Sequence, residues 1–215
     1  MSVAAAPMAF LSDIHGNLSA LDAVLEELTR EDIRKVYVAG DILLGGVDPL
    51  DVWKRLQSIG ATCVRGVSDE ALVTLDPKQL PVTNEEERKA VQQFAETRRA
   101  LGDLIVERIR RLPERMRIPL VDGKELLLMH GAPSPQTDEI THEMSDDEIL
   151  AALDDDPADV FIVGASHVAF ERSVDDRTIV NVGSVGASPE GKMAHYAVVR
   201  PSMLGVDIQL RHAAY

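Results

Sequence analysis

The sequence predicts an α/β fold in which two sheets face each other and helices cover their outer faces. In the first half of the chain, short apolar runs alternate with segments whose leucines recur at helical spacing. In the middle, Asp122-Gly123 separates two apolar runs and is typical of a hairpin turn. Further short apolar runs follow. Helices between strands favour a mostly parallel sheet, and we expect one domain over residues 1–215.

The first half supplies three strands and two helices. Met8–Leu11 is an apolar run that stops at Ser12-Asp13 and predicts the first strand. Leucines from Leu18 to Leu28 recur at helical spacing, with acidic residues between them, and predict the first helix. The next expected elements are a strand over residues 35–39, a helix over 49–59 and a strand over 62–64.

A charge-rich segment follows a loop expected at residues 77–81. Residues 84–112 predict two helices broken near Gly102. Seven apolar side chains are expected to form their buried stripe, namely Val91, Phe94, Leu101, Leu104, Ile105, Ile109 and Leu112. The charged side chains are expected to face solvent.

The second half opens with the hairpin, whose strands are expected over residues 117–121 and 124–129. Ser145 and Glu148 have the spacing of a capping box, which predicts a helix that ends near Leu153. Further strands are expected over residues 159–163, 178–182, 196–200 and 206–210.

The composition is that of an acidic globular protein, with 45% hydrophobic residues and a net charge of −14. The acidic surface disfavours generic nucleic-acid binding. A small phosphorylated substrate stays compatible, because a bound metal inverts the local charge. The N-terminus has no basic segment, and its apolar run is too short to span a membrane. The single Cys63 fits a reducing compartment. We therefore expect a cytoplasmic protein, and homo-oligomer formation stays open.

Polar side chains gather where the expected strands end. They are Asp13, His15, Asp41, Arg65, Ser68, Asp69, His130 and His167. The carboxyl ends of strands form the ligand crevice of open α/β sheets. Two aspartates and up to three histidines suit a borderline divalent metal such as Mn, Fe or Zn. Taken singly, each residue also has a local explanation, as a helix cap, a turn residue or a structural hydrogen-bond partner.

Six short segments occur in the order known from one enzyme family. They are Ser12-Asp13-Ile14-His15-Gly16-Asn17, Gly40-Asp41, Val64-Arg65-Gly66-Val67-Ser68-Asp69, His130-Gly131-Ala132-Pro133, Gly164-Ala165-Ser166-His167 and Asn181-Val182-Gly183-Ser184. With them the chain resembles the calcineurin-like metallophosphoesterases, especially their small single-domain phosphodiesterase branch, from about Pro7 to Val199. The resemblance implies a four-layer α/β/β/α sandwich of two facing mixed sheets, with two metals bridged by an aspartate.

The resemblance also implies a complete first metal site and an incomplete second one. The ligands of the first site are Asp13, His15, Asp41 and His167. The second site keeps Asp41, which is shared, and His130. Where the family has an asparagine and a histidine ligand, this chain has Val67 and Ala165, neither of which can coordinate a metal. We therefore expect one divalent ion, which is Mn, Fe, Zn or Ni.

The substrate end of the site departs from the family as well. The histidine that usually acts near the leaving group is Ser68, so Asp69 has no imidazole to orient. Arg65 and Asn17 are the candidate substrate-binding residues. A guanidinium suits phosphate oxygens, although a surface salt bridge is the alternative for Arg65. His142 lies in the loop after His130 and is a weaker candidate for the vacated second site.

Two classes of function follow. The first is a weakened, mononuclear, metal-dependent phosphoesterase that hydrolyses a small or nucleotide-like phosphodiester. The second is a catalytically inactive family member that binds a phosphate ligand or a protein partner through the same crevice. Specialisation to one metal and drift after loss of activity both account for Val67 and Ala165. A dinucleotide-binding domain is disfavoured, because no glycine-rich loop follows the first strand.

Overall fold

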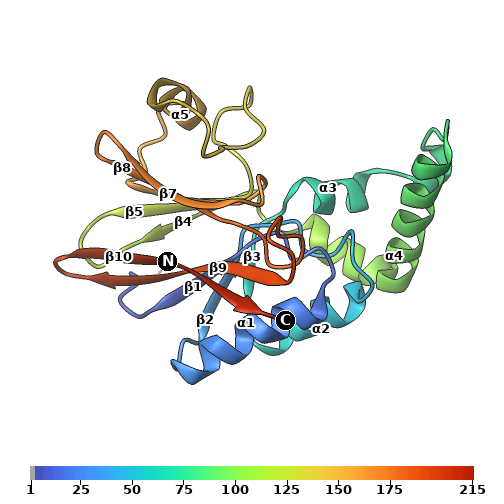
Figure 1. Ribbon diagram of the computed structural model, residues 1–215, viewed down its shortest axis with the longest axis horizontal. Helices are drawn as coiled ribbons and strands as arrows, with labels where there is room; N and C mark the ends of the chain where they lie inside the picture. Colours follow the sequence, from blue (N-terminus) through green and yellow to red (C-terminus); the bar gives the residue numbers. More distant parts are fainter. Residues whose placement is uncertain (1–2) are drawn as a thin grey trace.

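Two mixed, five-stranded sheets face each other at the centre of the molecule (Figure 1). The computed structural model describes residues 3–215. The first sheet has the order β10-β9-β1-β2-β3, formed by Gly205–Ala214, Met193–Ser202, Met8–Leu11, Lys35–Val38 and Thr62–Cys63. The second has the order β4-β5-β6-β8-β7, formed by Arg115–Pro119, Glu125–Met129, Val160–Val163, Arg177–Val182 and Ala169–Val174. The expected sandwich of facing mixed sheets is confirmed.

Parallel strands occupy the middle of each sheet. β1, β2 and β3 run parallel, and so do β5, β6 and β8. The antiparallel neighbours are β9 and β10 in the first sheet, and β4 and β7 in the second. Because the parallel strands of each sheet end on the same side, their following loops meet at one edge of the sandwich.

Helices cover the outer faces of both sheets (Figure 1). The helices are α1 (Leu18–Arg30), α2 (Pro49–Ser58), α3 (Val67–Thr74), α4 (Glu85–Arg110) and α5 (Asp146–Leu153). In Figure 1, α1 and α2 lie under the first sheet, α5 lies over the second, and α3 and α4 lie at one end. Within the described part of the chain, no helix is both long and apolar enough to span a bilayer.

Alternation along the central strands builds the core. Met8 and Phe10 of β1 belong to the cluster between the sheets, whereas Ala9 and Leu11 pack toward the helices. All four side chains are buried, which explains why β1 is a continuous apolar run without polar alternation.

The charge-rich segment differs from its expected packing. The break is confirmed, because Gly102 has φ 68° and ψ 166° inside α4. The expected stripe is wrong at Leu104, which is 70% exposed, while Val106 is buried. The non-helical residue resets the direction of the second half of α4, so the helical phase counted from Phe94 no longer applies after Gly102.

Two elements lie outside the sequence prediction. α3 begins at Val67, immediately after Gly66, in a stretch for which no element was expected. Its first turn is fixed by the Asp69 carboxylate, which accepts a hydrogen bond from the Gly66 N–H (3.0 Å). β7 is the other missed element. The loop expected at residues 77–81 contains one 3-10 turn over Pro77–Gln79.

Candidate metal centre

The polar residues expected at strand ends come together at one edge of the sandwich. Asp13 and His15 follow β1, and Asp41 follows β2. His130 directly follows β5, and His167 follows β6. The two sheets therefore each contribute side chains, so the centre lies where the loops of both sheets meet.

Several of these residues have a backbone conformation that ordinary side chains rarely adopt. Asp13, His15, Asp41 and His167 have φ values of 53°, 47°, 51° and 62°. This left-handed region costs energy for residues other than glycine. Hydrogen bonds between loops hold it in place, since the Asp13 N–H donates to the Gly40 carbonyl and the His15 N–H to the Asp41 carbonyl, both at 3.0 Å. All four residues belong to the candidate ligand groups of the centre.

Two glycines let the backbone approach the carboxylates. A Cβ atom on Gly66 would lie 2.2 Å from Asp41 Oδ1, and one on Gly164 would lie 2.7 Å from Asp13 Oδ2. The close approach allows backbone donors to reach the same groups. The Ser68 N–H donates to Asp41 Oδ1 at 2.9 Å.

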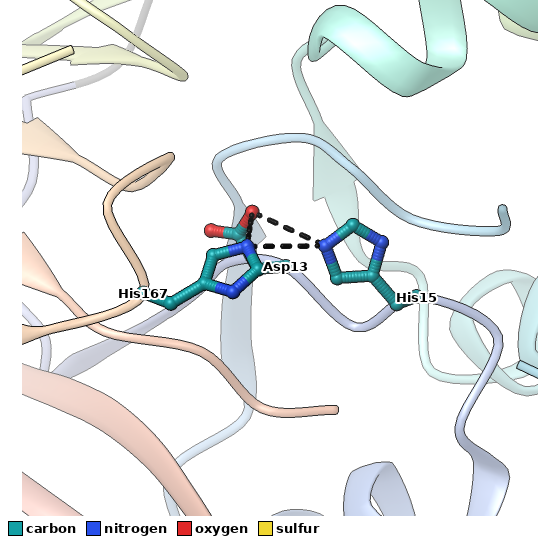
Figure 2. A group of neighbouring side chains, drawn as sticks. All are labelled: Asp13, His15 and His167. Carbon is teal, nitrogen blue, oxygen red and sulfur yellow. Dashed lines mark hydrogen bonds and ion pairs between the residues drawn. The ribbon is translucent and has the colours of Figure 1, made fainter. Parts of the chain in front are cut away.

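The tightest cluster consists of Asp13, His15 and His167 (Figure 2), and we refer to it as the first group. Asp13 Oδ1 lies 3.1 Å from His167 Nε2 and 3.6 Å from His15 Nε2. The two Nε2 atoms are 3.2 Å apart. Three potential ligand atoms therefore converge on one point.

Each of the three imidazoles at the centre is oriented by a backbone carbonyl. The Nδ1 pairs are His15 with Leu44 O (2.7 Å), His167 with Ala187 O (3.1 Å) and His130 with Ala39 O (2.9 Å). A carbonyl only accepts, so each Nδ1 carries the hydrogen and donates it. In the neutral ring this leaves a lone pair on Nε2, directed into the centre, which is the arrangement of a metal-binding histidine.

A second group consists of Asp13, Asp41 and His130. His130 Nε2 lies 3.4 Å from Asp41 Oδ1 and 4.0 Å from Asp13 Oδ1. The structure thus brings Asp41 together with His130, and Asp13 is the carboxylate that both groups contain. The expected four-ligand set for one ion, in which Asp41 joins the first group, stays a prediction.

The donor set of the first group fits a divalent cation. Asp13 Oδ1 is buried and has no hydrogen-bond partner within residues 3–215, which is costly for a carboxylate unless a cation satisfies it. Burial opposes its charge, but His15 and His167 outweigh burial and hold the pKa of Asp13 well below its usual range. One carboxylate and two imidazoles are ligands that Mn, Fe and Zn accept.

The aspartate raises the pKa values of both imidazoles in turn. Burial lowers the pKa of His15, but contact with Asp13 outweighs burial, and the net pKa lies above 6.5. The contact with Asp13 is the main cause of the raised pKa of His167. The first group therefore attracts positive charge, whether as a proton or as a metal ion.

The sequence of the chain matches one family profile over nearly its whole length. Residues 7–202 match the calcineurin-like phosphoesterase superfamily domain. The chain belongs to that superfamily. The resemblance carried by the six motifs is thereby confirmed, and the matched range agrees with the extent expected from them.

Three similar proteins match nearly the whole of this chain. The chain is 24% identical to an uncharacterized protein of Methanocaldococcus jannaschii, over 94% of this chain and 85% of that one. A hypothetical protein of Pyrococcus horikoshii has a similar fold, with a TM-score of 0.82, 22% identity and coverage of 98% and 88%. A metallophosphoesterase of Sphaerobacter thermophilus gives a TM-score of 0.74, 23% identity and coverage of 98% and 89%.

Asp69, which the resemblance leaves without an imidazole to orient, makes structural hydrogen bonds. Its carboxylate is fully buried, and it accepts hydrogen bonds from Ile42 N–H (3.1 Å) and Gly66 N–H (3.0 Å). Burial, followed by the charge of Asp41, raises the pKa of Asp69 to about 7. Asp69 thus ties the loop after β2 to the start of α3.

The guanidinium of Arg65 is already engaged. It pairs with Glu70 at 2.7 Å and Glu114 at 3.1 Å, and it donates to the Arg110 carbonyl at 2.7 Å. These contacts agree with the salt-bridge alternative, and a role in substrate binding stays a prediction. His142 packs beside the Phe170 ring and belongs to neither ligand group.

Asn17 caps helix α1 and also lines a cavity. Its Oδ1 accepts a hydrogen bond from the Ala20 N–H (3.1 Å) at the start of α1. It also lines a cavity of about 530 Å³ beside the first group. The cavity is bounded by His15, Asn17, Ser19, Gly45, Gly46, Val47, Asp48, His167, Gly186 and Ala187. A substrate role for Asn17 stays a prediction that its position allows.

Sequence reasoning assigned no role to two residues that hold the centre together. Asn181 Nδ2 donates to the Gly164 carbonyl at 2.7 Å and to Ser166 Oγ at 2.8 Å, which fixes the loop that carries His167. Ser184 Oγ donates to the Asp13 carbonyl at 2.8 Å. Both residues lie in the last of the six motifs, which is the sequence signal that could have indicated their role.

Proposed function

We propose that this chain is a metal-dependent phosphoesterase that hydrolyses phosphodiesters of small or nucleotide-like molecules, with one tightly held divalent ion. The main support for this proposal is the geometry of the first group. The Nε2 lone pairs of His15 and His167 converge beside Asp13 Oδ1, which is buried and has no hydrogen-bond partner within residues 3–215. Backbone carbonyls orient both rings, so the ligand atoms are in place before an ion binds.

A bound divalent ion supplies a Lewis acid that polarises a phosphoryl oxygen and acidifies a water. In the reaction, the oxygen of water forms a bond to phosphorus and its proton passes to solvent, the ester P–O bond breaks, and the departing alkoxide takes up a proton. Ser68 replaces the superfamily histidine near the leaving group, and its Oγ has no hydrogen-bond partner within residues 3–215. A serine hydroxyl is a poor acid near neutral pH, so solvent must supply that proton. General acid catalysis is typically worth about 10²- to 10⁴-fold, so aryl leaving groups suit the site best.

The two replaced ligand positions support one ion rather than two. Val67 is 68% exposed and has no donor atom to offer. Ala165 contributes only its backbone N–H, which donates to Asp13 Oδ2 at 3.1 Å. Asp13, Asp41 and His130 of the second group therefore lack the two side chains that would complete an ion site there.

The phosphodiester class has support from similar folds. A novel archaeal phosphodiesterase shares the fold, with a TM-score of 0.54, 16% identity and coverage of 97% of this chain and 99% of that one.

The three residues that replace superfamily site residues favour the second candidate function, a non-catalytic member that binds a phosphate ligand or protein partner in the crevice. Val67, Ser68 and Ala165 remove groups on which turnover depends, while the fold is kept.

One experiment separates these candidates. The purified protein is loaded with Mn²⁺, and hydrolysis of bis(4-nitrophenyl) phosphate is measured beside metal content. We expect metal-dependent turnover that Asp13→Asn lowers by at least about 100-fold. Asp51→Asn, an exposed residue on α2, serves as the matched control with unchanged turnover. A folded, metal-loaded protein without turnover would favour the non-catalytic candidate, and turnover that survives chelation would contradict both.

A further inference from the structure

The cavity beside the first group has an unusual charge for a protein that is proposed to bind phosphate. It has a volume of about 530 Å³, which is large enough for a small ligand. His15 and His167 form one part of its wall, so a ligand in it reaches the candidate metal centre. Among the described residues that line it, none is a lysine or arginine, and Asp48 is its one acidic side chain.

Asp48 does not make the capping hydrogen bond that an aspartate at the start of a helix commonly makes. It precedes Pro49 at the start of α2, where an aspartate side chain commonly accepts a hydrogen bond from the first turn. Here the side chain makes no capping hydrogen bond. The backbone N–H of Asp48 donates to the Gly16 carbonyl at 3.0 Å, which holds the residue against the loop that carries His15. The backbone of Asp48 is therefore held beside the cavity, and its half-buried carboxylate is not used to cap the helix.

Asp51 shows the contrast within the same helix. It lies in the first turn of α2, is more than half exposed, and pairs with Lys54 at 3.1 Å. Both aspartates add negative charge to the N-terminus of α2, so the helix dipole treats them alike. They differ because Asp48 lines the cavity and Asp51 does not.

The surrounding charge disfavours highly anionic ligands. The chain has a net charge of −14. Arg65, which the sequence singles out as a phosphate contact, is paired with Glu70 and Glu114 and lines a different cavity. A phosphodiester carries one negative charge and a phosphomonoester two near neutral pH. The diester therefore meets less repulsion in a cavity whose described lining contains a carboxylate and no lysine or arginine.

We propose that this cavity holds the ester arm of a phosphodiester that bears a positive charge, with Asp48 as its counter-ion. This rests on the proposed function, because the candidate metal centre places the phosphate. The cationic arm points away from the centre toward Asp48, and the phosphate charge faces the first group. The substrate class is thus a zwitterionic phosphodiester with an ammonium-type arm.

The test compares two aryl diesters that differ in one charge. They are 4-nitrophenyl phosphorylcholine and 4-nitrophenyl 3,3-dimethylbutyl phosphate, in which carbon replaces the choline nitrogen. With the Mn-loaded protein at low salt, we expect kcat/KM to favour the choline ester by about fivefold or more, since a partly exposed ion pair is modest in strength. The preference should shrink in high salt. Asp48→Asn should bring the ratio of the two substrates close to one, and Asp48→Lys should invert it. Asp51→Asn should keep the wild-type ratio.

Binding is measured separately, so that the inference does not depend on turnover. Calorimetry with the methylphosphonate esters of the same two alcohols, which lack the aryl leaving group, gives a ratio of Kd values. A preference for the choline ester that Asp48→Asn removes supports the proposal, with or without hydrolysis. Equal Kd values in the wild type, or a preference that survives Asp48→Asn, overturn it. Hydrolysis of the 3,3-dimethylbutyl ester with the same kcat/KM as the choline ester would overturn this inference and leave the proposed phosphoesterase function standing.

Discussion

The Nε2 atoms of His15 and His167 lie 3.2 Å apart, while both rings donate their Nδ1 hydrogens to backbone carbonyls. Two neutral rings in this arrangement bring two lone pairs together next to the Asp13 carboxylate. Positive charge between the rings relieves that repulsion, and it is supplied by a proton on one ring or by a metal ion. Proton and metal compete for the same place.

Metal affinity should therefore fall as the pH falls. Both histidine pKa values are raised, so protons occupy the rings at pH values where a free histidine is largely neutral. Below those pKa values, Mn²⁺ affinity should drop by up to about 100-fold per pH unit, because up to two protons leave for each ion bound. Calorimetry in buffers of different ionisation enthalpy counts the protons directly. His142→Ala, which lies outside both groups, should leave the count unchanged, and a pH-independent affinity would contradict the ligand assignment.

The stability of the metal-free protein should show the same competition. A histidine whose folded pKa is raised contributes stability that is fully present below its unfolded pKa of about 6.5. That contribution is lost as the pH rises through the raised folded value. The increase in Tm caused by saturating Mn²⁺ should consequently be larger at pH 8 than at pH 6. An equal increase at both pH values would show that His15 and His167 are not protonated in the metal-free state.

We expect at most one tightly bound ion per chain, and Asp13→Asn should weaken its binding more than Asp41→Asn. Asp13 Oδ1 belongs to both groups and has no other partner within residues 3–215, whereas Asp41 Oδ1 also accepts the Ser68 N–H. Elemental analysis after dialysis gives the stoichiometry, and Mn²⁺ titration gives the affinities. Two ions per chain after dialysis would show that the second group is complete despite Val67 and Ala165.

Asp69→Ala should destabilise the fold by about 2–4 kcal/mol, because it leaves two buried backbone N–H groups without an acceptor. Those donors are Ile42 and Gly66. Urea denaturation measures the change. Asp76→Ala is a useful control, since Asp76 accepts from the Lys78 N–H at an exposed turn, and its loss should cost about 1 kcal/mol or less. Equal losses for the two variants would contradict the structural task of Asp69.

Restoring the replaced superfamily residues should raise activity. We expect Val67→Asn, Ser68→His and Ala165→His together to increase Mn²⁺-dependent hydrolysis of an aryl diester by at least about 100-fold, the size of a general-acid contribution. Single changes should do little, because a second ion needs both ligands and the acid needs a substrate that the ions organise. Val67 is exposed beside the cavity next to His130, so an asparagine has room there. A folded, metal-loaded triple variant as slow as the wild type would favour the non-catalytic candidate.

The sequence predicted the features that depend on local pattern. The central strands and the site residues at their carboxyl ends follow from short apolar runs and from the polar residues that end them, as at Leu11 and Asp13. Side-chain partners depend on tertiary contacts that no local pattern contains. The grouping of Asp41 with His130, which joins loops of different sheets, was expected only from the family resemblance. The pairing of Arg65 with Glu114 spans 49 residues, and nothing in the sequence named that partner. The packing of Leu104 was missed because one residue with φ 68° changes the helical phase.

The backbone conformation of the centre also constrains its evolution. Position 67 is the first residue of a helix, where a branched side chain is tolerated, and it is a valine. Position 165 has φ 67°, where a branched side chain would be strongly strained, and it is an alanine. The two positions therefore admit different sets of amino acids. Homologues without a histidine at position 165 should carry alanine, glycine, asparagine or aspartate there, and valine, isoleucine or threonine should be rare.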